Sequence, residues 1–91
     1  MRVQQQLRDK ITRALAPVRF EIVDESSHHA GHAGARPGGE SHFRMTIVSA
    51  AFTGKSRVAR QRMVYDILAA ELASDVHALA LTTLTPDEDR R

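Results

Sequence analysis

The spacing of the apolar residues changes along this chain, and each spacing suits one kind of secondary structure. Near the start, apolar residues recur at steps of three and four, which predicts one face of a helix that Pro17 ends. The residues of this face are Val3, Leu7, Ile11, Ala14 and Leu15. From Val18 to Asp24 and again from His42 to Val48, apolar and polar residues alternate, and this period of two predicts two strands.

Alternation also predicts which side chains of the two strands face the core, because successive residues of a strand point to opposite faces of the sheet. The expected inward-facing residues are Val18, Phe20 and Ile22 in the first strand and Phe43, Met45 and Ile47 in the second. We expect the two strands to pair in antiparallel orientation.

The second half of the chain predicts a helix, a third strand and a short terminal helix. Phe52–Lys55 has the residues of a turn, and the hydroxyl of Ser56 can cap the helix that follows. The apolar stripe expected on that helix consists of Val58, Met63, Val64, Ile67, Leu68 and Leu72. The nearly continuous apolar run Val76–Leu84 predicts the third strand. Thr85–Glu88 carries a cap, a proline at the first helical position and a glutamate three residues after the cap.

This order of elements predicts an α+β fold in which helices pack on one face of a three-stranded mixed sheet. The second and third strands are joined through a helix, so we expect them to be parallel. We allow for an extra short helical turn before the long helix. A length of 91 residues supports one domain over residues 1–91, and 42% hydrophobic with 26% charged residues is ordinary globular composition.

Residues 24–41 form the one long interruption of this pattern. Ser, His, Ala, Gly and Pro dominate the segment, and its apolar residues follow neither period. We expect a long loop, and structureless loops of more than about 15 residues inside a compact domain are usually functional or disordered.

Several classes of function are disfavoured by what the chain contains. It has no cysteine, so sulfur ligands for any iron-sulfur or zinc chemistry must come from another molecule. It shows neither a nucleophile-base pairing nor a Walker-type loop, and we expect it not to be an enzyme. Its apolar runs are far shorter than the roughly 20 residues of a membrane-spanning helix, and its amino terminus lacks a signal-peptide core, so we expect no membrane contact and a cytoplasmic location.

Three segments, taken together, resemble the BolA family: Glu40–Phe43 at the second strand, Phe52–Lys55 before the helix and Val76–Leu81 in the third strand. Arg60–Tyr65 and Asp24–Ser26 extend the resemblance over nearly the whole chain. The combined order and spacing of these motifs are far more specific than any one of them.

The resemblance implies a fold like that of a class II KH domain and partnership with a monothiol glutaredoxin through a bridging 2Fe-2S cluster. It also implies a role in iron-sulfur delivery or iron regulation and, for some bacterial members, in transcriptional control linked to stress. The chain departs from the family in two places. Gln61 stands where members often carry histidine, and the proline of the family's loop falls later, at Pro37, because this loop is longer.

The same resemblance assigns cluster ligands. His77, in the third-strand motif, matches the family's histidine ligand, and a second ligand lies in the loop, where only histidine is available here. The position after Asp24–Ser26 favours His29, while His32 is equally suited by sequence, and the choice stays open. Because a 2Fe-2S cluster needs four protein or thiol ligands, the remaining thiolates would come from the glutaredoxin and glutathione. We expect the isolated chain to hold no cofactor tightly and to be a monomer or weak dimer.

Each histidine also has a plainer interpretation. His28, His29 and His32 could belong to a solvated loop with incidental affinity for zinc or nickel. His77 could be a strand-end residue satisfied by a hydrogen bond, although its motif favours a ligand. For His42 we expect a structural hydrogen bond, with a role outside the first ligand shell as the alternative.

A different class of function rests on Lys55, Arg57, Arg60 and Arg62, which gather near the start of the long helix. These side chains could meet phosphate, which makes a nucleic-acid-binding regulator, with DNA as the partner, the alternative function. They could equally form a solvated helix face. The formal net charge of +2 is too small to imply nucleic acid by itself.

Overall fold

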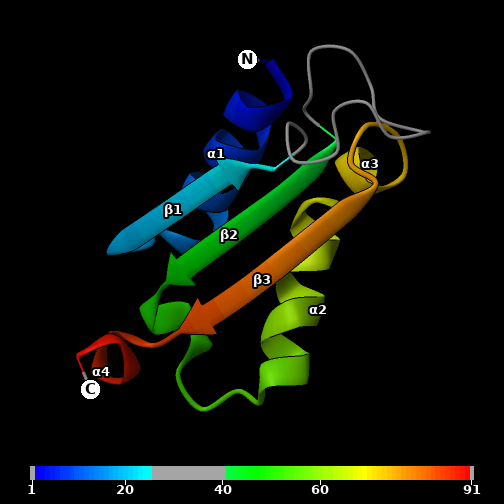
Figure 1. Cartoon of the computed structure of the whole chain (residues 1–91). Helices are drawn as coiled ribbons and strands as arrows, with labels where there is room; N and C mark the ends of the chain where they lie inside the picture. The colour runs from blue at the N-terminus through cyan, green and yellow to red at the C-terminus, as the bar shows by residue number, and fades with distance from the viewer. Residues whose placement is uncertain (1, 26–40, 91) are drawn as a thin grey trace.

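The computed structural model of the chain describes residues 2–25 and 41–90. Its helices and strands follow one another in the predicted order (Figure 1). They are α1 (Arg2–Leu15), β1 (Arg19–Asp24), β2 (His42–Val48), η2 (Ala50–Phe52), α2 (Arg57–Ile67), α3 (Ala69–Leu72), β3 (Ala78–Leu84) and α4 (Pro86–Asp89). The short turn allowed for before the long helix is η2.

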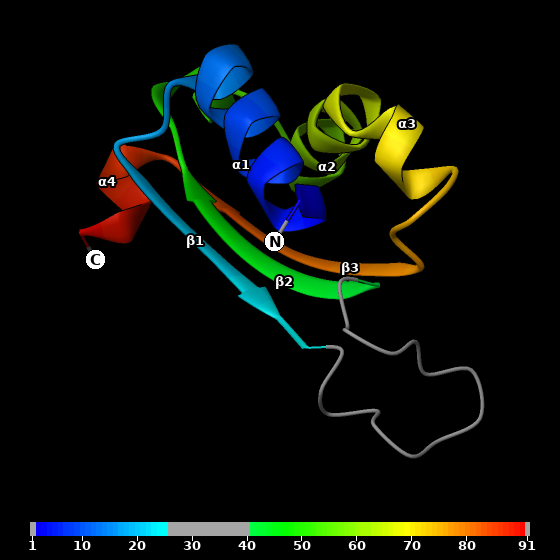
Figure 2. The same cartoon turned by 90° about the horizontal axis from the view of Figure 1, so that it is seen from above.

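The three strands form one sheet in the order β1-β2-β3. β1 and β2 are antiparallel, and β2 and β3 are parallel, as the sequence predicts. Figure 2 shows α1, α2 and α3 on the same face of the sheet, with α4 at the end where β3 finishes. The predicted α+β architecture with a mixed three-stranded sheet is confirmed.

The core lies between this sheet and the helices. α1 buries a stripe at steps of four, consisting of Val3, Leu7, Ile11 and Leu15. Met45 and Ile47 are fully buried on β2, and Phe43 is 2% exposed, so the predicted inward face of this strand is confirmed. Phe20 packs against the core, and Ile22 is part of it.

Three residues expected in the core are exposed instead. Val18 is 69% exposed because it precedes β1, in the turn after α1 where Ala16 has a φ of 43°. Val58 is 58% exposed, and the inward position of the first turn of α2 belongs to Arg60, four residues before the buried Val64. Ala14, at the border of the α1 stripe, is also exposed.

The predicted long helix is divided. α2 ends at Ile67, and the buried Leu68, with φ −102° and ψ 18°, separates it from α3. The start of α2 is as predicted, because the hydroxyl of Ser56 accepts a hydrogen bond from the N–H of Ala59 at 3.1 Å. β3 begins at Ala78, two residues later than the apolar run suggests, because the N–H of Val76 donates to the carbonyl of Glu71 and not to β2.

Candidate functional site

One end of the sheet brings together residues that are far apart in the sequence. Asp24 ends β1 beside Phe43, and His42, at the start of β2, pairs with Ala78 at the start of β3. The N–H of Glu25 donates to the carbonyl of His42 at 2.7 Å. Glu25, which precedes segment 26–40, therefore lies next to His42, the second residue after that segment.

His77 is exposed at the same end, immediately before β3. Its N–H donates to the carbonyl of Ser41 at 2.8 Å, and the N–H of Ala78 donates to the same oxygen at 3.2 Å. On the other side, Val76 is buried, and its N–H donates to the carbonyl of Glu71 at 2.9 Å. The backbone of His77 is thus hydrogen-bonded to Ser41, the residue that follows segment 26–40, while its imidazole faces outward.

His42 lies beside His77. Their ring centroids are 6.3 Å apart, and the planes meet at 64°, an edge-on contact. Ser41 Oγ, on a residue that is 1% exposed, lies 2.9 Å from Nδ1 of His42, so the structural hydrogen bond expected for His42 is present. Sequence reasoning did not place this ring next to His77. The parallel register, in which the starts of β2 and β3 are paired, is the signal that could have done so.

The donor set at this end is limited. The chain has no cysteine. Within residues 2–25 and 41–90, no three His, Cys, Asp or Glu side chains are grouped to hold a metal ion. His29 and His32, the loop ligands expected from the resemblance, lie outside the described residues. A metal centre at this end would need further donors beside His77.

The basic residues expected to meet phosphate are not equivalent. Lys55, Arg57 and Arg62 are exposed, as a phosphate-binding surface requires. Arg60 is 6% exposed, and its guanidinium donates to the carbonyls of Lys55 and Thr83 at 2.9 and 3.2 Å. Its remaining hydrogen bonds go to Glu88. Arg60 therefore does not belong to the exposed basic surface, because its donors are used inside the fold.

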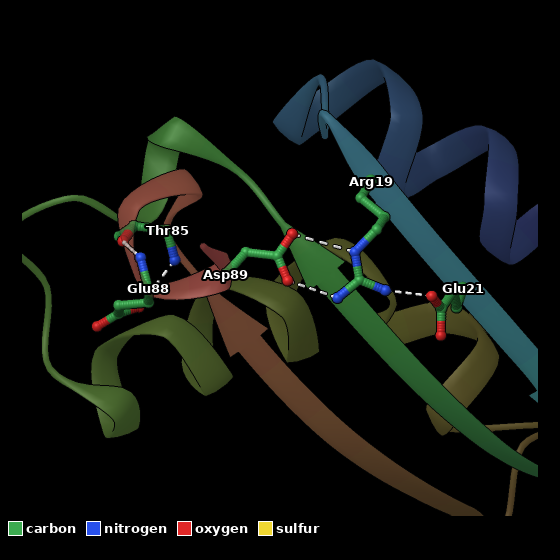
Figure 3. Close-up of polar contacts among 5 residues, drawn as sticks. All are labelled: Arg19, Glu21, Thr85, Glu88 and Asp89. Carbon is green, nitrogen blue, oxygen red and sulfur yellow. Dashed lines mark hydrogen bonds and ion pairs between the residues drawn. The ribbon is translucent and has the colours of Figure 1, made fainter. Parts of the chain in front are cut away.

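The opposite end of the sheet holds a polar network around α4 (Figure 3). Arg19 donates to both carboxylate oxygens of Asp89, at 3.2 and 2.6 Å, and also bonds to Glu21. These contacts raise the pKa of Arg19 and lower the pKa of Asp89, in each case chiefly through the hydrogen bond between the two. Glu88 completes a capping box with Thr85. This network stabilises the docking of α4 and lies away from His77.

The pKa of Glu88 is lowered to about 2 by the hydrogen bond from Arg60 and then by that from the backbone of Thr85. The carboxylate is therefore ionised at neutral pH.

Among the helices that the structure describes, none is long and apolar enough to cross a membrane.

The fold places the chain in a class of small α+β domains built on a three-stranded mixed sheet. The sequence profile of the BolA-like protein family matches residues 11–88, and the chain belongs to this family. Solved structures agree. The BolA domain of SufE1 from Arabidopsis thaliana superposes with a TM-score of 0.81 at 46% identity, covering 92% of each chain. The solution structure of BolA1 from Mus musculus gives 0.81 at 39% identity, covering 97% of this chain and 68% of that one.

Two relatives differ in how much of their own length this chain matches. The chain is 44% identical over 88 residues to the DNA-binding transcriptional regulator BolA of Escherichia coli strain K12, covering 97% of this chain and 80% of the relative. It is 48% identical over 86 residues, 90% of its length, to SufE-like protein 1, chloroplastic/mitochondrial, of Arabidopsis thaliana, but spans only 23% of that protein. Because this relative's name gives organelles, the cytoplasmic location stays a prediction.

Proposed function

We propose that this chain is a non-enzymatic adaptor that binds a monothiol glutaredoxin and supplies histidine ligands to a 2Fe-2S cluster shared with that partner and glutathione. The observation that carries the proposal is the place of His77, exposed at the sheet end and hydrogen-bonded through its backbone to Ser41. The adaptor would act in iron-sulfur cluster trafficking or in iron and redox regulation.

The chemistry of the donors supports a shared centre. His77, with either His29 or His32, gives at most two imidazoles, and a 2Fe-2S cluster takes four ligands. Thiolates from a second molecule would complete such a site. Histidine in place of two thiolates on one iron raises the reduction potential of a 2Fe-2S cluster. Imidazole must also be neutral to bind, so acid would release the cluster.

Anaerobic reconstitution tests the ligand assignment. The chain is mixed with a monothiol glutaredoxin, iron, sulfide and glutathione, and visible circular dichroism reports the cluster. His77→Ala should change the spectrum, and His29→Ala and His32→Ala, made separately, should identify the loop ligand. Arg62→Ala is the control, because Arg62 is exposed on α2. Binding of each variant to glutaredoxin without iron, measured by calorimetry, separates loss of a ligand from loss of the partner.

Two results would contradict this proposal. One is a His77→Ala spectrum identical to that of the unchanged protein. The other is a shared cluster whose pulsed electron-spin spectrum shows no nitrogen coupled to iron. Either result would leave family membership and fold intact and remove the histidine ligands.

A second candidate function is a nucleic-acid-binding regulator. It is supported by the exposed Lys55, Arg57 and Arg62 and by the name of the Escherichia coli relative. The affinity for labelled duplex DNA should fall as salt is added. A plot of the logarithm of the binding constant against the logarithm of the salt concentration should have a slope of about −0.9 per phosphate contact. Replacing these three residues by glutamine should reduce the slope, whereas Arg13→Gln on α1 should not. An unchanged anisotropy with micromolar duplex at low salt would exclude this function.

A further inference from the structure

The two edges of the sheet differ in composition. β1, at one edge, carries Arg19, Glu21 and Asp24, and charged side chains are a common protection of edge strands against pairing with other chains. β3, at the other edge, has the sequence ALALTTL over seven residues, without a charge or a proline. β3 therefore lacks the usual protection of an edge strand. Its uncharged composition is that expected of an edge that pairs with another strand.

The hydrogen-bond pattern identifies the free groups of this edge. The N–H of Ala78 bonds to Ser41 and the carbonyl of Leu84 accepts from Ser49, so the even-numbered residues of β3 face β2. Leu79, Leu81 and Thr83 consequently direct their backbone groups outward. Among residues 2–25 and 41–90, Arg60 bonds to the carbonyl of Thr83, and no other donor or acceptor pairs with these outward groups.

A groove follows the same edge. It has a volume of about 230 Å³ and lies between the first turns of α2 and the second half of β3. The lining residues are Arg57, Gln61, Leu81, Thr82, Thr83 and Leu84. An extended segment paired with β3 would pass along this groove, with its backbone on the strand and its side chains against α2.

The charge of the groove indicates what occupies it. Arg57 is its one charged lining residue, and the first turn of α2 has no acidic side chain to offset the positive end of that helix. A second copy of the chain would bring two such positive grooves together. A single-stranded nucleic acid would lack a stacking surface, because none of the lining residues is aromatic. An acidic extended peptide satisfies both the backbone groups and the charge.

We propose that the free edge of β3 and the adjoining groove bind an acidic, extended peptide segment of a partner protein by strand addition, with an acidic side chain opposite Arg57. The groove lies along the second half of β3, whereas His77 precedes the first residue of that strand. The proposal does not depend on the cluster.

The test uses a labelled seven-residue peptide, the length of β3, in which glutamate and valine alternate. On binding to the full chain, amide hydrogen exchange of Leu79, Leu81 and Thr83 should slow about tenfold, while the amides of Ala78 and Ala80, already bonded to β2, should not change. Arg57→Gln should weaken binding about fivefold. Arg62→Gln is the matched control, since Arg62 is exposed but does not line the groove.

Two further peptides separate strand addition from simple charge attraction. A glutamate peptide N-methylated at every residue, which cannot donate a backbone hydrogen bond to β3 from either of its edges, should lose binding, and a lysine peptide should not bind. The proposal is overturned if the methylated or the lysine peptide binds as well as the glutamate peptide, or if none binds. It is also overturned if a thymine oligonucleotide protects the same amides, or if they are already protected in a dimer of the free chain.

Discussion

Arg60 on α2 and Glu88 on α4 are joined by hydrogen bonds of 2.7 and 3.3 Å, one to each carboxylate oxygen. The arginine side chain is only 8% exposed, and its other donors reach the carbonyls of Lys55 and Thr83. One side chain therefore fastens the turn before α2, the end of β3 and the terminal helix together. Its guanidinium carbon also lies 5.9 Å from the ring centre of Phe52.

Replacing Arg60 should therefore destabilise the fold. Arg60→Ala leaves the part-buried carbonyls of Lys55 and Thr83 and the Glu88 carboxylate without their donor, and we expect the free energy of unfolding to fall by about 2 to 4 kcal/mol. The exposed Arg62→Ala should change it by less than about 0.5 kcal/mol. Urea denaturation followed by circular dichroism measures both. Equal stabilities of the two variants would mean that Arg60 does not hold the turn before α2, the end of β3 and α4 together.

The Glu88 carboxylate makes stability depend on acid. Its pKa in the folded protein is about 2, against an ordinary 4.5, so the folded state binds this proton more weakly than the unfolded state does. The resulting stabilisation is complete above pH 4.5 and is lost as the pH falls toward 2. Urea midpoints across this interval should fall for the unchanged protein and fall less for Glu88→Gln. Parallel slopes for the two proteins would assign the acid sensitivity to other groups.

Much of the fold follows from local patterns in the sequence. Alternation alone identifies the buried face of β2, and the bounds of that strand are as predicted. Patterns in one segment do not show which way a helix is turned toward its neighbours. On α2 an arginine takes the inward position at which an apolar residue was expected, because its charge is matched by Glu88, 28 residues later.

The candidate site shows the same limit. The resemblance to the BolA family singled out His77, but the contact between His42 and His77 depends on a parallel register that no local pattern contains. The pairing of Arg19 with Asp89, which are 70 residues apart, is equally invisible to periodicity. The two candidate loop ligands, His29 and His32, lie outside the residues that the structure describes.

Ser49 offers a test of how α1 is joined to the sheet. Its hydroxyl, on a residue that is 1% exposed, donates to the carbonyl of Leu15 at 2.6 Å and accepts from the N–H of Ala51 at 3.1 Å. Ser49→Ala leaves both groups unpaired, so the free energy of unfolding should fall by about 1 to 3 kcal/mol. The control is Ser56→Ala, an exposed cap whose loss should cost about 1 kcal/mol. Thermal unfolding measures the loss of stability in both variants. A smaller loss for Ser49→Ala than for Ser56→Ala would contradict the role of Ser49 in joining α1 to the sheet.

His77 can be separated from the fold that carries it. Its imidazole is exposed, whereas the hydrogen bond that anchors it comes from the backbone, which alanine retains. His77→Ala should therefore change the free energy of unfolding by less than about 0.5 kcal/mol. His42→Ala, which removes a half-buried ring bonded to Ser41, should cost about 1 kcal/mol. If urea denaturation shows His77→Ala to be the less stable variant, the histidine supports the sheet end, and a changed cluster spectrum could then reflect altered structure instead of a lost ligand.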